Sequence, residues 1–359
     1  MAILEYKCPN CDGAIRFDSS TQKMTCPFCD AEFDVETLEQ YQATVSEAPA
    51  DAFNWSAAEH ESRGELGADE VINYSCPACA GEIFGDVNMA ATHCPYCGNP
   101  VVIAEKIGGT NKPDYVMPFK LDKESAKAAL RNYLRNKPLL PSLFKSDHRI
   151  DSITGIYVPF WLFDCGAHAD IRYRAEKIRT WSDRSYDYTE HSYFHVGRSG
   201  DLGFEKIPVD GSAKLDDAYM EAIEPFDYTA LEPFQTAYLA GYAADKYDVD
   251  AESGKQRVNE RIRQSIEKAL SDTVTGYSSV QKQHSTVQVS SGTVAYALLP
   301  VWMLNTKFGG ETYVFAMNGQ SGKFVGRLPV SRSRMWLWFS GLFVALSAVS
   351  SVVCHLLMR

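Results

Sequence analysis

The sequence predicts an α+β protein with two small zinc ribbons, a central α+β domain and one C-terminal transmembrane helix. Three observations lead to this prediction: a duplicated cysteine pattern in the first third, amphipathic helices that alternate with apolar strands after it, and an uncharged apolar segment at the end. A chain of 359 residues has room for more than one domain. Its 45% hydrophobic and 23% charged residues are typical of a globular protein.

The cysteine pattern is Cys-x2-Cys-x14-Cys-x2-Cys, and it occurs twice. The eight residues are Cys8, Cys11, Cys26, Cys29, Cys76, Cys79, Cys94 and Cys97. Each pair suits a tight turn that presents two thiolates, and a short hairpin between pairs brings four thiolates into a tetrahedron. We therefore predict two structural zinc ions, in ribbons at 1–38 and 72–107. Iron in a rubredoxin-like site fits the same ligands and stays open. Because four thiolates close the metal shell, a catalytic metal is not expected.

The segment at 39–71 is acidic and poor in branched apolar residues, so we expect a flexible linker there. Phe53 and Trp55 are two of its few aromatic residues. They are interpreted either as a docking motif, or as a chance pair or residues that pack locally on a ribbon.

The central domain is expected at 112–330. A helix should begin after Asp122 and another should span roughly 255–270, each followed by apolar strands. The strands near 156–164 and 298–305 share the order Pro-apolar-Trp-apolar-apolar-Asp/Asn. This repetition indicates either an internal duplication of a helix-plus-hairpin unit or two strands that occupy similar core positions.

The C-terminal segment 335–358 contains no Asp, Glu, Lys or Arg. Four basic residues precede it: Lys323, Arg327, Arg332 and Arg334. This order predicts a single-pass transmembrane helix that anchors the chain to the cell membrane by its tail, with the N-terminal bulk in the cytoplasm.

Charge argues against nucleic acid as a partner. The first 110 residues hold 18 acidic and five basic residues, whereas phosphate contacts need Lys and Arg. The sequence NGQSGK at 318–323 lacks both the first Gly and the final Ser or Thr of a phosphate loop, so it is expected to be a hairpin turn. His168 with Asp170, and His191 with His195, alternate along expected strands and are candidates for a site. No nucleophile motif accompanies them, so we do not expect an enzyme.

Several stretches resemble bacterial transcription-factor-IIB-type zinc-ribbon membrane proteins, often labelled as primosomal replication helicase-like. They are the two CPxC ribbons, FEKIPVDGS at 204–212, AIEPF at 222–226, LPVW at 299–302 and NGQSGK at 318–323. The resemblance implies an association with phage-shock-type and SPFH (flotillin-like) membrane-stress proteins. It supplies no catalytic residues, and the missing phosphate loop does not fit a helicase.

We therefore expect a membrane-anchored, non-catalytic zinc-ribbon adaptor that recruits or scaffolds cytosolic proteins, with hetero-oligomers as one outcome. The alternative is a membrane-tethered, nucleic-acid-binding or replication-associated protein without its own helicase motor. The sequence names neither the partner nor the stimulus.

Overall fold

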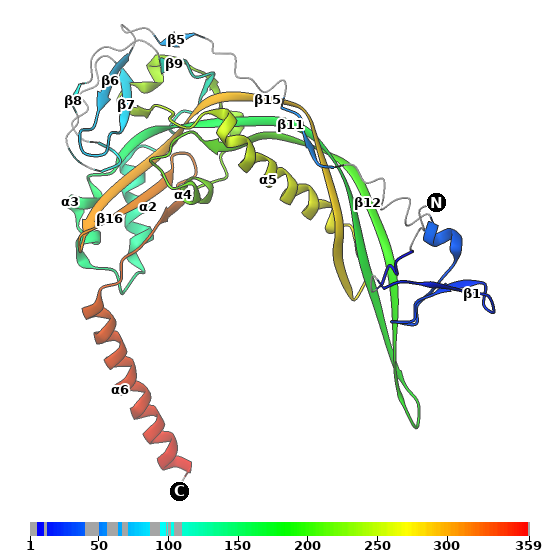
Figure 1. The fold of residues 1–359 in the computed structure, drawn as a ribbon. Helices are drawn as coiled ribbons and strands as arrows, with labels where there is room; N and C mark the ends of the chain where they lie inside the picture. The colour runs from blue at the N-terminus through cyan, green and yellow to red at the C-terminus, as the bar shows by residue number, and fades with distance from the viewer. Residues whose placement is uncertain are drawn as a thin grey trace. The chain divides into compact units, whose positions relative to one another are not determined.

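The structure is a computed structural model of the chain (Figure 1). It describes residues 6–10, 13–39, 50–55, 64–66, 71–86, 94–97, 99, 102–103 and 110–357. The chain divides into two compact units. Unit 1 comprises Met1–Ala57, Cys165–Phe204 and Asn259–Gly292, and unit 2 comprises Ala58–Asp164, Glu205–Val258 and Thr293–Arg359.

Unit 1 contains the first ribbon, which is a small antiparallel sheet. Its strands are β1 (Arg16–Asp18), β2 (Lys23–Thr25) and β3 (Glu32–Phe33). Met24 on the central strand lies opposite Phe17 on one side and Phe33 on the other. The ribbon has a core of its own, formed by Cys8, Ile15, Cys26 and Leu38. Because so small a sheet buries few apolar side chains, it needs a further source of stability.

The rest of unit 1 consists of segments of three long strands and one helix. These elements are β11 (Thr154–Ser182), β12 (Asp187–Asp210), β15 (Ser279–Phe308) and α5 (Ala251–Ser271). A short strand, β4 (Ala52–Phe53), pairs in parallel with β15 at Gln288 and Val289.

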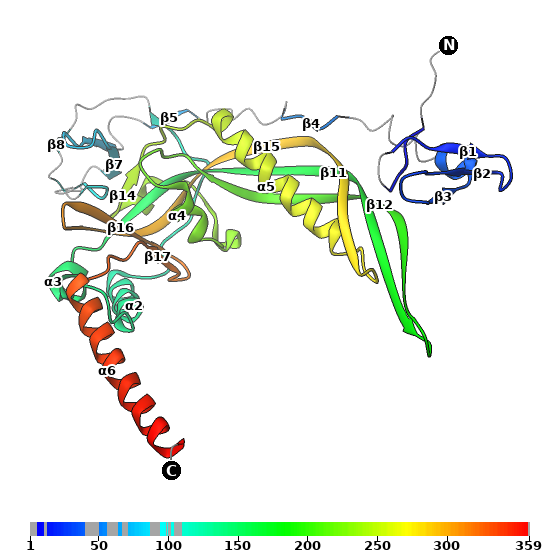
Figure 2. The same cartoon turned by 60° about the horizontal axis from the view of Figure 1, so that its bottom comes forward.

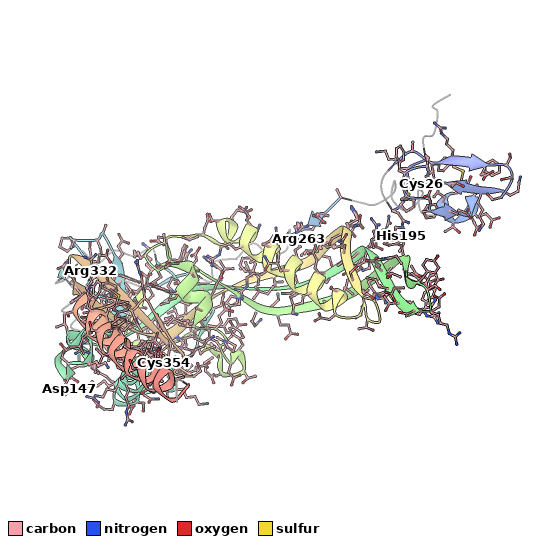
Figure 3. The ribbon with its side chains drawn as sticks, turned by 90° about the horizontal axis from the view of Figure 1, so that it is seen from below. Cys26, Asp147, His195, Arg263, Arg332 and Cys354 are labelled. Carbon is pink, nitrogen blue, oxygen red and sulfur yellow. The ribbon has the colours of Figure 1, made fainter. Side chains whose placement is uncertain are left out.

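Residues 51–55 of the expected flexible linker therefore pack on unit 1. The indole of Trp55 is 6% exposed, and its Nε1 donates to Asn259 Oδ1 at 2.8 Å. Asp51 forms an ion pair with Arg263, which Figure 3 labels on α5. Of the two readings of Phe53 and Trp55, local packing describes what these residues do, although they pack on a strand and a helix rather than on a ribbon. Residues 40–49 and 56–63 lie outside the described residues.

Unit 2 is built on a mixed sheet with the strand order β13-β10-β15-β11-β14-β7-β6-β8, to which β12, β16 and β17 add further pairings. The additional strands are β6 (Val71–Ser75), β7 (Glu82–Asp86), β8 (Val102–Ile103), β10 (Tyr115–Val116), β13 (Glu232–Pro233), β14 (Ala243–Asp245), β16 (Glu311–Asn318) and β17 (Phe324–Gly326). A separate pair comprises β5 (Glu65–Leu66) and β9 (Thr110–Asn111). The helices are α2 (Lys123–Arg135), α3 (Asp147–Ile150), α4 (Asp217–Ala222), α6 (Arg332–Leu357) and three 3₁₀ turns, Ser142–Lys145, Tyr228–Ala230 and Thr236–Leu239.

Helix α2 lies beside β16 in both ribbon views (Figures 1 and 2). Its apolar stripe, Ala126, Leu130 and Leu134, shares a core with Trp302 of β15 and Phe315 of β16. The helix begins at Asp122, whose side chain accepts from Ser125 N at 2.8 Å. This cap satisfies a backbone N–H that has no partner within the helix.

Two halves of unit 2 follow one plan. In each half a short strand precedes a capped helix and then a long hairpin: β10, α2, β11 and β12 in one, and β14, α5, β15 and β16 in the other. The short strand of each half pairs in parallel with the long strand of the other half, β10 with β15 and β14 with β11. The start of α5 repeats the cap of α2, since Asp250 accepts from Ser253 N at 2.8 Å.

The two tryptophans of the repeated strand pattern make the same bond. Trp161 Nε1 donates to Val249 O at 2.9 Å, and Trp302 Nε1 donates to Leu121 O at 3.1 Å. Both acceptors stand one residue before the capping Asp of the other half. The prolines of the pattern also correspond: Pro159 O accepts from Gly211 N at 2.8 Å, and Pro300 O accepts from Gly319 N at 2.9 Å. Matched contacts of this kind indicate an internal duplication.

The membrane prediction is wrong. Residues 335–357 of the predicted span fall in α6, and residue 358 lies outside the described residues. Among the described residues no helix is long and apolar enough to span a bilayer. The prediction relied on the absence of charge, but serines such as Ser340, Ser347 and Ser351 interrupt the apolar run. The tail anchor and the single-pass localisation at the cell membrane are corrected with it. Figure 3 labels Arg332 and Cys354 along this helix.

Candidate metal centres

All four cysteine turns share one backbone hydrogen bond. In each turn the N–H of the first cysteine donates to the carbonyl five residues later: Cys8 to Gly13, Cys26 to Ala31, Cys76 to Gly81 and Cys94 to Asn99, at 2.7 to 2.9 Å. In two turns the fifth residue has a left-handed backbone, with φ of 53° at Asp30 and 54° at Ala80. The repeated turn fixes both thiols of a pair on one side of the loop, as a metal-binding knuckle requires.

The second cluster brings four thiols together. Cys76, Cys79, Cys94 and Cys97 place their sulfur atoms within 4.8 Å of one another. Two of the pairs, Cys76 with Cys97 and Cys79 with Cys94, lie 3.5 and 3.6 Å apart. A tetrahedral shell with Zn–S bonds of about 2.3 Å sets its sulfurs about 3.8 Å apart. The cluster therefore has the size and the ligands to hold one metal ion.

Backbone N–H groups and neighbouring thiols shape the electrostatics of this cluster. Burial opposes ionisation of Cys76, but N–H groups of Ala78 and Cys79 and the thiols of Cys97 and Cys79 lower its pKa to about 7. Burial raises the pKa of Cys79 and, more strongly, that of Cys94. One thiol thus ionises readily while others need a cation to do so, which is the behaviour expected of a metal site.

The first cluster contains Cys8, Cys26 and Cys29, and the sulfurs of Cys8 and Cys29 lie 3.6 Å apart. The predicted fourth ligand, Cys11, lies outside the described residues. Cys8 and Cys26 are buried whereas Cys29 is exposed. Asn10 N donates to Cys8 Sγ at 3.4 Å, which orients and stabilises the thiolate as outer partners of metal ligands do. This cluster also suits a metal ion.

The second ribbon is built into the sheet of unit 2. Its strand β7 pairs with β6 on one side and with β14 on the other, where Phe84 lies opposite Ala244 and Ile83 opposite Asp245. Tyr74 and Ile83 are 3% and 2% exposed and belong to the main core of the unit. The side chain of Asn305 donates to Pro95 O within the Cys94 turn. Loss of metal here is therefore expected to disturb the core.

A buried polar cluster lies beneath the same turn. Asp245 is fully buried, accepts from Ser212 Oγ at 2.5 Å and pairs with Lys214 at 3.1 Å. The Lys214 ammonium lies 5.6 Å from the ring centroid of Tyr96. Burial, followed by the charge of Asp245, raises the pKa of Tyr96 well above its ordinary value. Tyr96 is thus a neutral side chain that joins the metal-binding turn to this ion pair.

Two of the candidate histidines, His168 and His191, have separate acidic partners. His168 Nδ1 lies 2.8 Å from Asp201 Oδ1, and Ser199 Oγ lies 3.3 Å from His168 Nε2. His191 pairs instead with Glu176. The side chains of His168 and Asp201 are 46% and 85% exposed. Water surrounds this Ser-His-Asp row, so it lacks the desolvated setting in which such groups catalyse.

Sequence reasoning did not identify the residues that bind the second ribbon to the core. Tyr96, the neighbouring residues Ser212 and Lys214, and Asp245 come from three separate parts of the sequence and form no motif. Asn305 is different, because it ends the repeated Pro-apolar-Trp pattern. Its partner position in the other half, Asp164, accepts from the Lys206 backbone N–H at 2.5 Å. The last position of the repeated pattern thus makes a side-chain hydrogen bond in both halves, and the pattern could have singled out Asn305.

No family model matches the chain, and no solved structure matches it. One curated relative is similar over almost its entire length. The "Uncharacterized protein YdjG" of Bacillus subtilis (strain 168) is 35% identical over 354 residues, which cover 97% of this chain and 98% of that protein. Identity at this level over whole chains shows common descent, and this chain belongs to the family of B. subtilis YdjG.

Proposed function

We propose that the protein is a non-catalytic adaptor whose two ribbons each hold one structural zinc ion and whose first ribbon binds other proteins. The converging thiols support the zinc assignment, since four soft ligands in a small tetrahedron suit Zn²⁺. A closed four-thiolate shell supplies folding energy rather than an open catalytic position. In the second ribbon, metal binding would stabilise the sheet and core of unit 2, because its strand β7 pairs with β14.

The surface of the first ribbon carries the adaptor proposal. Phe28 stands between Cys26 and Cys29 and is 73% exposed, and Phe17 on β1 is 51% exposed. The Phe28 ring rests on Gly13, where an added Cβ would lie 2.5 Å from Phe28 Cδ2. An aromatic side chain that is exposed but held in place makes a good interface anchor, because little side-chain entropy is lost on binding.

The negative charge of the first ribbon indicates which kind of protein surface it would bind. The ribbon segment that follows Phe28 carries five exposed acidic residues, Asp30, Glu32, Asp34, Glu36 and Glu39. Of these, Glu32 pairs with Lys23 at 3.6 Å. Together with Phe28 the acidic residues favour a protein surface that presents an apolar pocket with basic residues at its rim. The family resemblance adds phage-shock-type and SPFH proteins as candidates for that partner.

Quantitative co-purification tests this proposal. The tagged full-length chain would be captured from its own cells and compared with Phe28→Ala and Tyr186→Ala. Tyr186 is a matched control because it is 69% exposed in the β11–β12 hairpin, away from the ribbon sequence. We expect a small set of proteins to be lost with Phe28→Ala and retained with Tyr186→Ala. A purified member of that set should then bind the Phe28 variant about tenfold or more weakly.

The adaptor proposal fails if no captured protein depends on Phe28. It also fails if both variants lose the same proteins, because the loss would then follow from any exposed aromatic residue.

One observation supports nucleic-acid binding as a second candidate. In the β11–β12 hairpin the rings of Trp181 and Tyr188 stack at 5.3 Å, and Arg179 lies 5.6 Å from the Trp181 ring centroid. Exposed aromatic rings beside cations bind single-stranded nucleic acid. A labelled single-stranded oligonucleotide should then bind the native chain, lose affinity with Trp181→Ala and weaken steeply with salt. Absence of binding at low salt would eliminate this candidate.

A further inference from the structure

A cavity of about 440 Å³ opens in unit 2 where the start of α5 faces α4. Acidic and apolar side chains line it together: Asp210, Asp216 and Asp217 with Leu215 and Val249. Its volume lies within the range of small-molecule sites and far exceeds that of a single ion. The cavity belongs to unit 2 and the first ribbon to unit 1, so this inference does not rest on the adaptor proposal.

Carboxylates exceed cations at this cavity. Of the lining carboxylates, Asp210 and Asp217 both pair with Arg257, whose Nη1 lies 3.0 Å from Asp210 Oδ1 and 2.9 Å from Asp217 Oδ1. The Nη2 atom of Arg257 lies 2.9 Å from Oε1 of Glu221, which is not part of the lining. One guanidinium thus faces three carboxylates. Since Asp210 is only 2% exposed, water screens its charge poorly. The surplus of negative charge favours a cation.

The Asp210 side chain has an unused acceptor. Its Oδ2 atom is buried and has no hydrogen-bond partner among the described residues. A buried carboxylate oxygen without a donor costs free energy, because folding removed the water that solvated it. Because Asp210 is one of the residues that line the cavity, a donor on a ligand bound there could satisfy this acceptor.

The internal duplication shows what fills the corresponding place in the other half. Gly211 and Gly319 correspond in the two halves, because each donates to the proline carbonyl of the repeated pattern. The residues just before them, Asp210 and Asn318, therefore occupy equivalent positions. The Asn318 Nδ2 group donates to Ile223 O and Pro225 O, both at 3.1 Å. Beside Asn318 the space is filled by the segment 223–225 of the chain itself. Beside Asp210 the equivalent space is the cavity. Because a carboxylate has acceptors where the amide has donors, the occupant at Asp210 must supply donors.

A divalent metal fits this place less well than an ammonium group. Within the described part of the chain, only the cysteine clusters bring three metal-ligand atoms within 4.8 Å of one another. At the cavity the Arg257 guanidinium already pairs with both Asp210 and Asp217, so a second, divalent cation would meet its positive charge. We propose that the cavity binds a protonated primary amine, whose ammonium donates to Asp210 and Asp217 and whose apolar stem lies against Leu215 and Val249. The amine comes either from a free small molecule or from a lysine side chain of a partner protein.

Calorimetric titration of the full-length, metal-loaded chain tests this proposal. The amine probes are n-butylamine, 1,4-diaminobutane and Nα-acetyl-lysine amide, and the comparison probes are 1-butanol, CaCl₂ and inorganic phosphate. We expect saturable binding of the amines and none of 1-butanol at concentrations up to about 10 mM. Tighter binding of the lysine derivative than of the diamine assigns the site to a partner's lysine. The reverse order assigns it to a free amine.

Variants identify the residues. Asp210→Asn removes the charge with little change of shape, and we expect amine affinity to fall about tenfold or more. Glu232→Gln is the matched control, since Glu232 is an exposed carboxylate on β13, and it should change affinity less than about twofold. If Asp210→Asn does not fold, Asp217→Asn replaces it, because the Asp217 side chain is 57% exposed.

The proposal is overturned if no amine binds, or if Asp210→Asn and Asp217→Asn bind amines as well as the native chain does. It is also overturned if only calcium or phosphate binds, since either result would assign different chemistry to the cavity.

Discussion

Truncation of Ile83 to alanine tests whether the second ribbon is part of the core of unit 2. Ile83 lies on β7, is 2% exposed and packs within the same core as Val158 and Leu299. Replacing a buried Ile by Ala leaves a cavity and removes its apolar contacts, at a cost of about 2 to 5 kcal/mol. Because Ile83 is not a metal ligand, this perturbation tests the packing without removing a thiol.

The assay is urea unfolding of the metal-loaded chain, followed by tryptophan fluorescence. Trp161 and Trp302, each 3% exposed, report on unit 2. We expect Ile83→Ala to lower the free energy of unfolding of this transition by about 3 kcal/mol. The control is Ile15→Ala, which removes a side chain from the separate core of the first ribbon and should leave the unit 2 transition unchanged. An unchanged transition in Ile83→Ala, or equal shifts in both variants, would refute the reasoning.

Two further predictions follow from other buried groups. Burial and the Asp217 carboxylate raise the pKa of Asp210 to about 6 despite Arg257. The folded state therefore retains this proton more strongly than the unfolded state, and the resulting stability of about 3 kcal/mol is lost as pH rises from about 4 through about 6. Urea unfolding across this range should show Asp210→Asn gaining stability relative to the native chain, and a pH-independent difference would contradict the assignment. Gly292→Ala would place a Cβ 2.1 Å from Trp55 Cε3, so hydrogen exchange at 51–55 should rise; Gly166→Ala, with its nearest contact at 3.7 Å, should not raise it.

Local patterns predicted the parts of the fold that depend on local chemistry. The cysteine spacing predicted two clusters because a Cys-x2-Cys turn needs only the backbone of a few residues to present its thiols. Helix α2 followed from its apolar spacing and the Asp122 cap, and α5 followed from apolar spacing alone, although it begins at Ala251 rather than near residue 255. The Pro-apolar-Trp repeat left open an internal duplication or two strands in similar core positions, and the matched tryptophan bonds favour the duplication. The turn at 318–323 also forms as expected, with Asn318 N donating to Lys323 O at 3.0 Å.

Features that depend on distant partners were not visible in the sequence. Strand β12 is exposed on both faces in its first part, from Asp187 to His195, and exposed and half-buried residues alternate only after it. The first part therefore shows no alternation of apolar and polar positions. The placement of the second ribbon in the sheet depends on β14, whose Asp245 is far along the chain from Tyr96. The prediction of a membrane span in α6 was wrong because it relied on the absence of charged residues and not on mean hydropathy.

Metal analysis of the purified chain tests the central claim most directly, which is that each ribbon holds its own zinc ion through four thiolates. The measurement compares the metal content of the native chain with that of Cys26→Ser. Two zinc ions per native chain are expected, and one in Cys26→Ser with the unfolding transition of unit 2 retained. Iron in place of zinc, or a variant that still holds two zinc ions or holds none, would contradict the account.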